Sequence, residues 1–316
     1  MPSPRRTATA AALPWAAWAV LRATGTERGF PLVPAISFTP YAALTAVLPL
    51  GLALRAGSRP AAVLAGAAGI ALAAPVLSRA RPAAPLPAGG GRRVRVATVS
   101  LRRGHVPAAG VVDLVRAADV DVLAVAELTP GSEALLRAAG LDRLLPEEHV
   151  LPARPGAVLS ASGALWSRLP ITGRGAVPGE FEQPSAVLDV GGRPLEVVAV
   201  HSAPPAVSPR AVRRWAADLA ALPSPSAAVP QVLAGDFNAT ADHAAFRSLL
   251  AAGWTDAAQA TGQGLAWTWR PLRLKVPRLT LDHVLVGPRV GVTAVRFVPV
   301  PGSDHRSVVA DLALPG

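Results

Sequence analysis

The sequence predicts an α/β domain with a mixed β-sheet arrangement, preceded by N-terminal helices that cross a membrane. The first 80 or so residues contain three long apolar runs with few charges between them. In the rest of the chain, short apolar runs alternate with segments of helical periodicity, which is typical of α/β folds. Several of these runs are joined by short turns and others by helices, so parallel and antiparallel neighbours are both expected.

The composition supports the membrane prediction. Hydrophobic residues make up 51% of the 316 residues and charged residues only 16%, and the mean hydropathy is +0.37. These values are more apolar than those of an ordinary soluble protein. The formal charge of +11 suits an anionic partner such as nucleic acid, phosphorylated lipid or a membrane face. The absence of cysteine excludes disulfides and zinc–thiolate sites.

Residues 1–78 are predicted to be a membrane anchor with two or three transmembrane helices. Pro31–Leu54 carries no charge and is long enough to cross a bilayer core of roughly 30 Å. Pro60–Leu77 is rich in alanine and glycine and lies near the lower limit of length. Thr7–Leu21 is short for a span, so the apolar part of a signal peptide or an interfacial helix is an alternative for it.

The arginines give a divided signal for orientation. If the arginines before the first run and between the second and third runs are cytoplasmic, three spans place the folded domain outside. The remaining flanks also carry arginine, so both ends of the anchor are basic. We expect a multi-pass protein of the cell membrane with its folded domain on the extracytoplasmic side.

Residues 79–93 read as a Pro/Gly/Ala linker without periodicity, and residues 94–316 as the folded domain. The expected strands, from alternation or short apolar runs, are 94–98, 120–126, 163–166, 185–190, 195–200, 232–235, 281–286, 297–300 and 307–312. The expected helices are 111–118, 132–139, 209–222 and 242–252.

Polar side chains stand at the ends of several predicted strands. The apolar run that closes at Gly235 is followed at once by Asp236 and Asn238. Taken alone, this pattern is more often a strand followed by an Asx turn. Other strands carry similar residues at their ends, and the full set is Glu127, His201, Asp236, Asn238, Asp282, Asp304 and His305.

This set has a definite chemistry. Oxygen-rich clusters with few histidines suit a hard divalent ion, Mg²⁺ or Mn²⁺, whereas zinc recruits more His or Cys. A metal ion, two histidines and several carboxylates are the parts needed to hydrolyse a phosphate ester. Asp282 and the adjacent His283 point to opposite faces of their strand, so we expect His283 to be structural.

Five motifs occur in an order that resembles the endonuclease/exonuclease/phosphatase superfamily. They are DVDVLAVAEL, VVAVHSAPP, GDFN, LDHVLV and GSDHRSVV, and the similarity extends from about Val94 to Leu312. The resemblance implies a deoxyribonuclease-I-like fold, a four-layer sandwich of two mixed β-sheets flanked by helices. The chain then looks like a membrane-anchored bacterial member of that superfamily.

The resemblance also implies a role for each site residue. Glu127 and Asp304 would hold the metal ion, and Asp236 would orient or deprotonate the attacking water. Asn238 would hold the phosphate. His201 would contact or protonate the phosphoryl group, and His305 would contact the phosphate with Asp282 as its carboxylate partner.

The chain departs from the family pattern at two positions. Ser100 stands where the first strand of the family usually ends in a metal-binding asparagine, and Ala126 replaces a common glutamine. A serine hydroxyl is a shorter and weaker ligand than an amide oxygen, so Ser100 is a candidate metal ligand of reduced strength. Either the affinity for metal falls, or a water molecule fills the gap.

These observations predict a divalent-metal-dependent phosphoric ester hydrolase, similar to a phosphodiesterase or nuclease, that uses in-line water attack. The substrate stays open between nucleic acid and a phospholipid or lipid-linked phosphate, and the oligomeric state is not indicated. The alternative is a catalytically weak member that acts as a membrane-bound binding or scaffold protein. Three histidines without a matching motif, His105, His149 and His243, are expected on the surface. Trp267 and Trp269 alternate as on a strand and are expected in the core, and the alternative from the resemblance is a place near the substrate groove. The basic run of Arg270, Arg273, Lys275 and Arg278 is expected to be a solvated loop, with a phosphate-contacting loop as the alternative.

Overall fold

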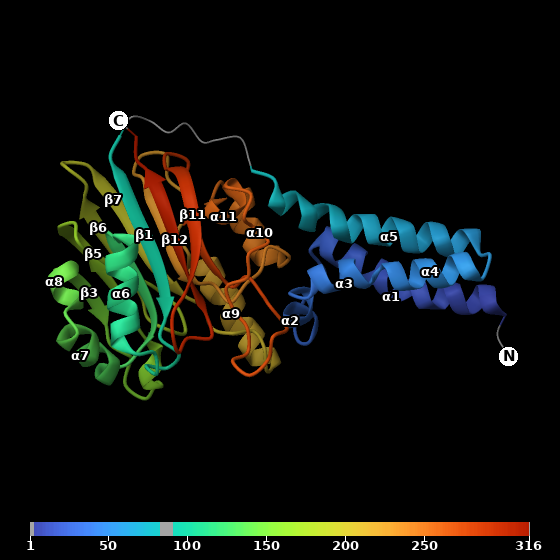
Figure 1. The fold of residues 1–316 in the computed structure, drawn as a ribbon, viewed down its shortest axis with the longest axis horizontal. Helices are drawn as coiled ribbons and strands as arrows, with labels where there is room; N and C mark the ends of the chain where they lie inside the picture. Colours follow the sequence, from blue (N-terminus) through green and yellow to red (C-terminus); the bar gives the residue numbers. More distant parts are fainter. Residues whose placement is uncertain (1–2, 83–90, 316) are drawn as a thin grey trace.

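A computed structural model describes residues 3–82 and 91–315, in which a bundle of N-terminal helices projects from a β-sandwich (Figure 1). We call helices α1 to α5 the stalk. The N-terminal end of the described chain lies at the free tip of the stalk, and the C-terminal end lies on the sandwich (Figure 1). Residues 83–90 of the predicted linker fall outside the described residues.

The sandwich consists of two six-stranded sheets. The first has the order β11 (Gly291–Pro299), β12 (Arg306–Ala313), β1 (Arg93–Ser100), β2 (Val122–Leu128), β4 (Ser162–Ser167) and β3 (Glu147–Leu151). The second has the order β5 (Ile171–Val177), β6 (Gln183–Asp189), β7 (Pro194–His201), β8 (Gln231–Asp236), β10 (Asp282–Val286) and β9 (Thr255–Asp256). The pairs β1–β2 and β7–β8 are parallel and their outer neighbours antiparallel, so both sheets are mixed as predicted.

Helices cover the outer face of each sheet. The first sheet carries α6 (Ala108–Ala118), α7 (Pro130–Ala138) and α8 (Leu141–Leu144), which share one hydrophobic cluster with it. The second carries α9 (Pro209–Ala221) and α10 (Ala244–Ala251), and the short α11 (Ala257–Ala260) packs near β10 and β11. Side chains alternate along the strands, so that Val96 faces the other sheet while Ala97 faces the helices. Two mixed sheets flanked by helices confirm the predicted class.

Three edge strands, β3, β5 and the two-residue β9, were not predicted. All of β3 is half-buried, and all of β5 is half-buried or exposed. An edge strand has one neighbour and little burial, so its sequence need not show the apolar pattern that marks a central strand. Gly173 and Gly175 weaken the pattern of β5 further.

The stalk contains α1 (Pro4–Thr24), α2 (Leu32–Ile36), α3 (Thr39–Thr45), α4 (Val47–Arg55) and α5 (Arg59–Leu77). Helix α5 packs against α1, α3 and α4, and alanines lie at the contacts, which lets the helices approach closely. Within the described residues, one helix, Arg59–Ala80, is long and apolar enough to cross a membrane, judged by length and composition alone.

The predicted second span is therefore not one continuous helix. Pro31–Leu54 is divided among α2, α3 and α4. Pro40 lies in the first turn of α3, where a missing N–H is tolerated, but it cannot continue a helix from α2. Hydropathy alone did not detect this break, because proline is compatible with an apolar segment.

Buried ion pairs attach the stalk to the sandwich. The Asp242 carboxylate, which is fully buried, accepts from Arg22 Nε at 2.9 Å and from Arg79 Nη1 at 3.0 Å. Arg79 lies in a short 3₁₀ turn, Ser78–Ala80, that continues α5. The Asp242 carboxylate of the sandwich thus binds both the C-terminal turn of α1, through Arg22, and the turn after α5, through Arg79.

The prediction that His243 is a surface residue is wrong. His243 is fully buried, and its Nε2 lies 3.1 Å from the carbonyl oxygen of Val33 and 3.3 Å from Ser37 Oγ. Val33 itself packs into the hydrophobic cluster beneath α9 and α10. The partners of His243 belong to a distant part of the chain, so no local pattern indicated them.

We predict that Asp242→Ala destabilises the protein by about 3–5 kcal/mol, because it leaves the buried guanidinium group of Arg79 and the half-buried one of Arg22 without their carboxylate. Chemical denaturation of the detergent-solubilised chain, followed by tryptophan fluorescence, measures this. The matched control is Asp113→Ala, which removes an exposed carboxylate 3.4 Å from Arg116 and is expected to leave the midpoint unchanged. Equal midpoints for both variants would contradict the docking role of Asp242.

Candidate active site

Three site residues stand in one row at the edge of the second sheet. Asp236, the last residue of β8, lies opposite Asp282, the first residue of β10, and beside His201, the last residue of β7. The strand ends are adjacent because β7 and β8 run parallel while β10 runs in the opposite direction. Register alone therefore brings together residues from three separate motifs.

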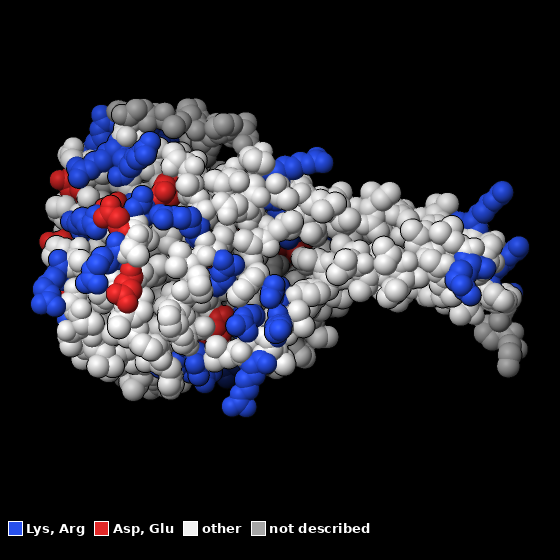
Figure 2. Space-filling view, in the orientation of Figure 1, with Lys and Arg blue, Asp and Glu red and all other residues white. Residues whose placement is uncertain are grey.

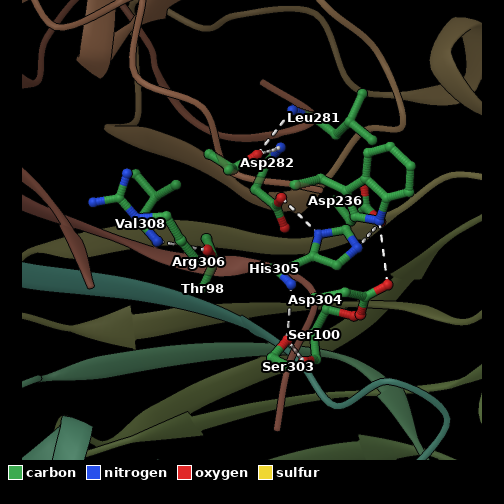
Figure 3. A network of polar contacts seen from close by, with 12 residues as sticks. Thr98, Ser100, Asp236, Leu281, Asp282, Ser303, Asp304, His305, Arg306 and Val308 are labelled. Carbon is green, nitrogen blue, oxygen red and sulfur yellow. Dashed lines mark hydrogen bonds and ion pairs between the residues drawn. The ribbon is translucent and has the colours of Figure 1, made fainter. Parts of the chain in front are cut away.

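His305 crosses from the other sheet and lies between the two aspartates (Figure 3). Its Nδ1 is 2.8 Å from Asp282 Oδ2, and its Nε2 is 4.0 Å from Asp236 Oδ2. Burial alone would lower the pKa of His305, but the charge and hydrogen bond of Asp282, with Asp236 nearby, raise it to about 10. His305 is thus a buried cation that faces two carboxylates.

Asp236 is held by the turn that follows it. Its Oδ1 accepts from the backbone N–H of Asn238 at 2.8 Å, and Asn238 Nδ2 donates to the carbonyl oxygen of Ser202 at 2.9 Å. Burial and then the charge of Asp282 raise the pKa of Asp236 to about 8. At Gly235, φ is +147° and a Cβ would lie 2.0 Å from the carbonyl oxygen of Val200, so this position of the motif requires glycine.

His201 has the opposite electrostatic character. It is buried, its ring stacks on Phe181 with centroids 4.4 Å apart, and its backbone N–H donates to Gln183 Oε1. Burial, followed by the nearby charge of His305, lowers the pKa of His201 to about 3. The buried Nδ1 of His201 has no hydrogen-bond partner among the described residues.

Glu127 and Ser100 meet at the end of the first sheet. Ser100 Oγ donates to Glu127 Oε1 at 3.2 Å, and the backbone N–H of Arg103 donates to Oε2 at 2.6 Å. Glu127 has a left-handed backbone with φ +57°, which is uncommon for a residue other than glycine and is often found at functional sites. The Ser100 hydroxyl therefore orients Glu127, and this contact was not apparent from the sequence.

Asp304 is placed by its neighbours. Trp269 Nε1 donates to Asp304 Oδ2 at 3.2 Å, and Ser303 Oγ donates to the carbonyl oxygen of Ser100 at 2.9 Å. Ser303 Oγ also accepts from the backbone N–H of His305 at 3.0 Å. This serine ties the loop carrying Asp304 and His305 to the strand that ends at Ser100 (Figure 3).

One cleft of about 820 Å³ brings the predicted residues together. Six of them line it: Glu127, His201, Asp236, Asn238, Asp304 and His305. Ser100 and Asp282 lie behind the lining, where Ser100 contacts Glu127 and Asp282 contacts His305. Within the described residues, the ligand atoms of Asp236, Asp282 and His305 lie within 4.8 Å of one another. A cleft with four nearby carboxylates fits a hard divalent cation, which would offset their repulsion.

Some residues in and around the site were not predicted to belong to it. Trp269 lines the cleft, whereas the favoured prediction was a core position. Phe181, Gln183 and Arg103 belong to no motif, and only the folded chain reveals their contacts. Arg278, from the basic run, lies 5.3 Å from the ring centroid of Trp267 and so packs on an aromatic face.

The prediction that His283 is structural agrees with its position. His283 Nδ1 lies 3.0 Å from Asp256 Oδ2, and its ring packs on Phe237 and Phe246, on the face of β10 away from the cleft. Burial lowers the pKa of His283, but the charge and hydrogen bond of Asp256 outweigh it, so the pKa is raised overall.

The chain belongs to the endonuclease/exonuclease/phosphatase family. The family model matches residues 91–305, which include every predicted site residue. Members of this family are generally hydrolases of phosphoester bonds and depend on a divalent metal. No curated protein matches the sequence.

Solved structures share the fold of the sandwich. An endonuclease/exonuclease/phosphatase from Beutenbergia cavernae aligns with 21% identity over 71% of this chain and 72% of its own, with a TM-score of 0.52. Humanized D. rerio TDP2 aligns with 14% identity over 70% and 98%, with a TM-score of 0.55. Sphingomyelinase C from Streptomyces griseocarneus aligns with 17% identity over 70% and 99%, with a TM-score of 0.50.

We predict that His201 stays neutral and titrates only near pH 3, because its ring is buried without a carboxylate partner, whereas His283 titrates above its usual value of about 6.5. NMR of ¹⁵N-labelled histidine side chains across a pH series, in the presence of EDTA, measures both. Asp256→Asn should lower the pKa of His283 and leave that of His201 unchanged. Titration of His201 near 6.5 would contradict its burial in the site.

Proposed function

We propose that this protein is a membrane-anchored, divalent-metal-dependent phosphoric ester hydrolase of the phosphodiesterase or nuclease type. The observation that carries the proposal is the meeting, in one cleft, of a buried carboxylate, a cation paired with a second carboxylate, and two further carboxylates suited to a metal ion. The family supports this chemistry because its members generally hydrolyse phosphoester bonds.

Asp236 is the base in this proposal. Its raised pKa suits a group that takes a proton from water near neutral pH. The water oxygen forms a bond to phosphorus in line with the leaving group, and the bond from phosphorus to the leaving oxygen breaks. Asp236 takes the proton from the water and releases it to solvent, and the leaving alkoxide takes up a proton from solvent, so that the protons balance and the site returns to its starting state.

The two histidines have different roles because His305 is protonated and His201 is neutral. His305, kept protonated by Asp282, stabilises the negative charge that develops on the phosphoryl oxygens. His201 is neutral, so it supports the leaving oxygen by a hydrogen bond rather than by carrying a charge. Asn238 lines the cleft and orients the phosphate.

Glu127 and Asp304 are the proposed ligands of Mg²⁺ or Mn²⁺. The ion, when bound, supplies a positive charge that polarises the phosphoryl group. Ser100 donates a hydrogen bond to Glu127, so its contribution is to orient that carboxylate and, through its lone pairs, to offer a weak additional ligand. Glu127 also receives the backbone N–H of Arg103, so its position is fixed from two sides.

The Ser100 contact also favours the second candidate function. A hydroxyl that is engaged with Glu127 replaces the amide oxygen that the family pattern provides, which would weaken metal binding. A catalytically weak membrane-bound binding or scaffold protein is therefore the alternative. The two candidates differ in whether Mg²⁺ or Mn²⁺ binds and supports turnover.

The stalk supports the proposed membrane anchoring and a multi-pass arrangement. In Figure 2 the middle of the stalk is free of charged side chains, and basic side chains gather at its tip. Arg5, Arg6 and Arg59 line one groove at that tip, because α1 begins where α5 begins. A cationic tip on the cytoplasmic side would place the sandwich outside the cell membrane.

We expect the full-length chain to hydrolyse bis-p-nitrophenyl phosphate with Mg²⁺ or Mn²⁺ and to lose this activity in EDTA. Glu127→Ala and Asp236→Asn should each lower kcat at least about 100-fold, because one removes a metal ligand and the other the base. Asp113→Asn, an exposed carboxylate on α6, is the matched control and should retain the rate. Full metal-dependent turnover by Glu127→Ala would overturn the assignment, and silence with every metal would favour the scaffold candidate.

We predict that the sandwich lies outside the cell membrane and the tip of the stalk in the cytoplasm. Single-cysteine labelling tests this topology without ambiguity, because the chain has no native cysteine. A cysteine at Leu135, exposed on α7, should react with a membrane-impermeant maleimide in intact bacterial cells. A cysteine at Pro60, exposed at the tip of the stalk, should react only after the cells are permeabilised. The reverse pattern would place the sandwich in the cytoplasm, and labelling of both positions in intact cells would argue against membrane insertion.

A further inference from the structure

We infer that the elbow of the stalk, residues 31–40, forms a wall of the catalytic cleft and selects phosphoesters that an apolar chain holds in the bilayer. This inference rests on the proposed hydrolase function and membrane anchoring. It assigns a substrate class, a membrane lipid with a phosphoester headgroup, to a site that the family alone leaves open.

The elbow shares the cleft with the proposed catalytic residues. Pro34, Ser37 and Phe38 line the same space as His201 and His305. Pro34 lies within α2, and Ser37 and Phe38 form the turn between α2 and α3, where the apolar segment is interrupted. The segment that breaks the predicted second span is therefore the one that reaches the active site.

Contacts on several sides fix the position of the elbow. Val33 is buried in the cluster beneath α9 and α10, and Ser37 is buried against His243. Tyr41, just after the elbow, accepts from the backbone N–H of Arg278 at 2.7 Å. Because Val33, Ser37 and Tyr41 are all anchored to the sandwich, the elbow is a built part of the cleft and not a loosely apposed helix end.

The cleft has a polar end and apolar walls. Arg102 and Arg103 line it together with the histidines and suit a phosphate group. On the elbow side Phe38 is 38% exposed, and elsewhere in the lining Val158 is 64% exposed. Apolar side chains left open to solvent beside a phosphate site fit a substrate with a charged head and an apolar body.

The location of the elbow decides between the two substrate classes. Helix α2 lies where the stalk meets the sandwich (Figure 1). Leu32, its first residue, and Phe30, two residues before it, are each 43% exposed. With the stalk in a bilayer, these side chains lie at the membrane surface, and the adjacent cleft wall lies at the level of lipid headgroups. A nucleic acid would have to approach a cleft that the stalk and the membrane flank on this side.

Two esters with the same scissile bond test this inference. They are p-nitrophenyl hexadecyl phosphate and p-nitrophenyl methyl phosphate, which differ only in the chain that enters the bilayer. With the full chain in phosphatidylcholine vesicles and Mn²⁺, we expect kcat/KM to be at least about 100-fold higher for the hexadecyl ester. A single-stranded 20-nucleotide DNA is expected to be cleaved more slowly than the hexadecyl ester.

The variants separate the wall from simple enrichment of substrate in the membrane. Phe38→Asp and Val158→Asp, on two parts of the cleft wall, should each lower the hexadecyl-to-methyl ratio at least about tenfold. Leu135→Asp, an equally drastic change at an exposed residue of α7, should keep the wild-type ratio. Phe38→Leu should keep it too, because it retains an apolar side chain.

The outcomes distinguish this inference from the proposed function. Equal kcat/KM for the two esters, or faster cleavage of the DNA, would overturn the lipid assignment and leave the hydrolase proposal standing. If Phe38→Asp and Val158→Asp leave the hexadecyl-to-methyl ratio of kcat/KM unchanged, the cleft wall does not select the substrate. Hydrolysis of neither ester and no cleavage of the DNA would overturn the proposed function, and this inference with it.

Discussion

Asp236 and Asp282 are buried on neighbouring strands, directly opposite each other in the register, and their mutual repulsion constrains the rest of the site. Two buried carboxylates on directly opposite residues of neighbouring strands cannot both keep their negative charge unless nearby groups compensate for it. His305 provides a cation between them, and the backbone and side-chain N–H groups of Asn238 donate to Asp236. The hydroxyl of Thr268 holds the backbone of Asp282. Asp236, Asp282 and His305 are therefore placed by an electrostatic requirement as well as by the sheets.

The same constraint explains the difference between the two histidines. His305 lies between carboxylates and is a cation, whereas His201 lies against Phe181, away from a carboxylate hydrogen bond, and is neutral. In the proposed hydrolase, a charged histidine would stabilise the phosphoryl oxygens and a neutral one would support the leaving oxygen, so having both states at one pH suits that chemistry. The fold achieves this by taking His305 from one sheet and His201 from the other.

The loop after β8 joins this site to the stalk. Asp236 and Asn238 face the cleft, while Asp242 and His243, a few residues later, bind Arg22, Arg79 and the elbow. Residues 236–243 thus carry candidate catalytic residues at one end and the residues that bind the stalk at the other. Part of the stalk also completes the cleft, since Pro34, Ser37 and Phe38 line it.

The sequence by itself determined the family, the mixed arrangement of strands and helices, and the residues that end the central strands. Buried central strands show clear apolar runs, and the polar residues that terminate them are conspicuous for that reason. The edge strands β3 and β5, the break in Pro31–Leu54 and the burial of His243 were decided only by the tertiary structure. So were the contact of Ser100 with Glu127 and the ion pairs of Asp242. Local patterns report burial and periodicity over a few residues, whereas these features depend on which distant segments pack together, and that is a property of the folded chain alone.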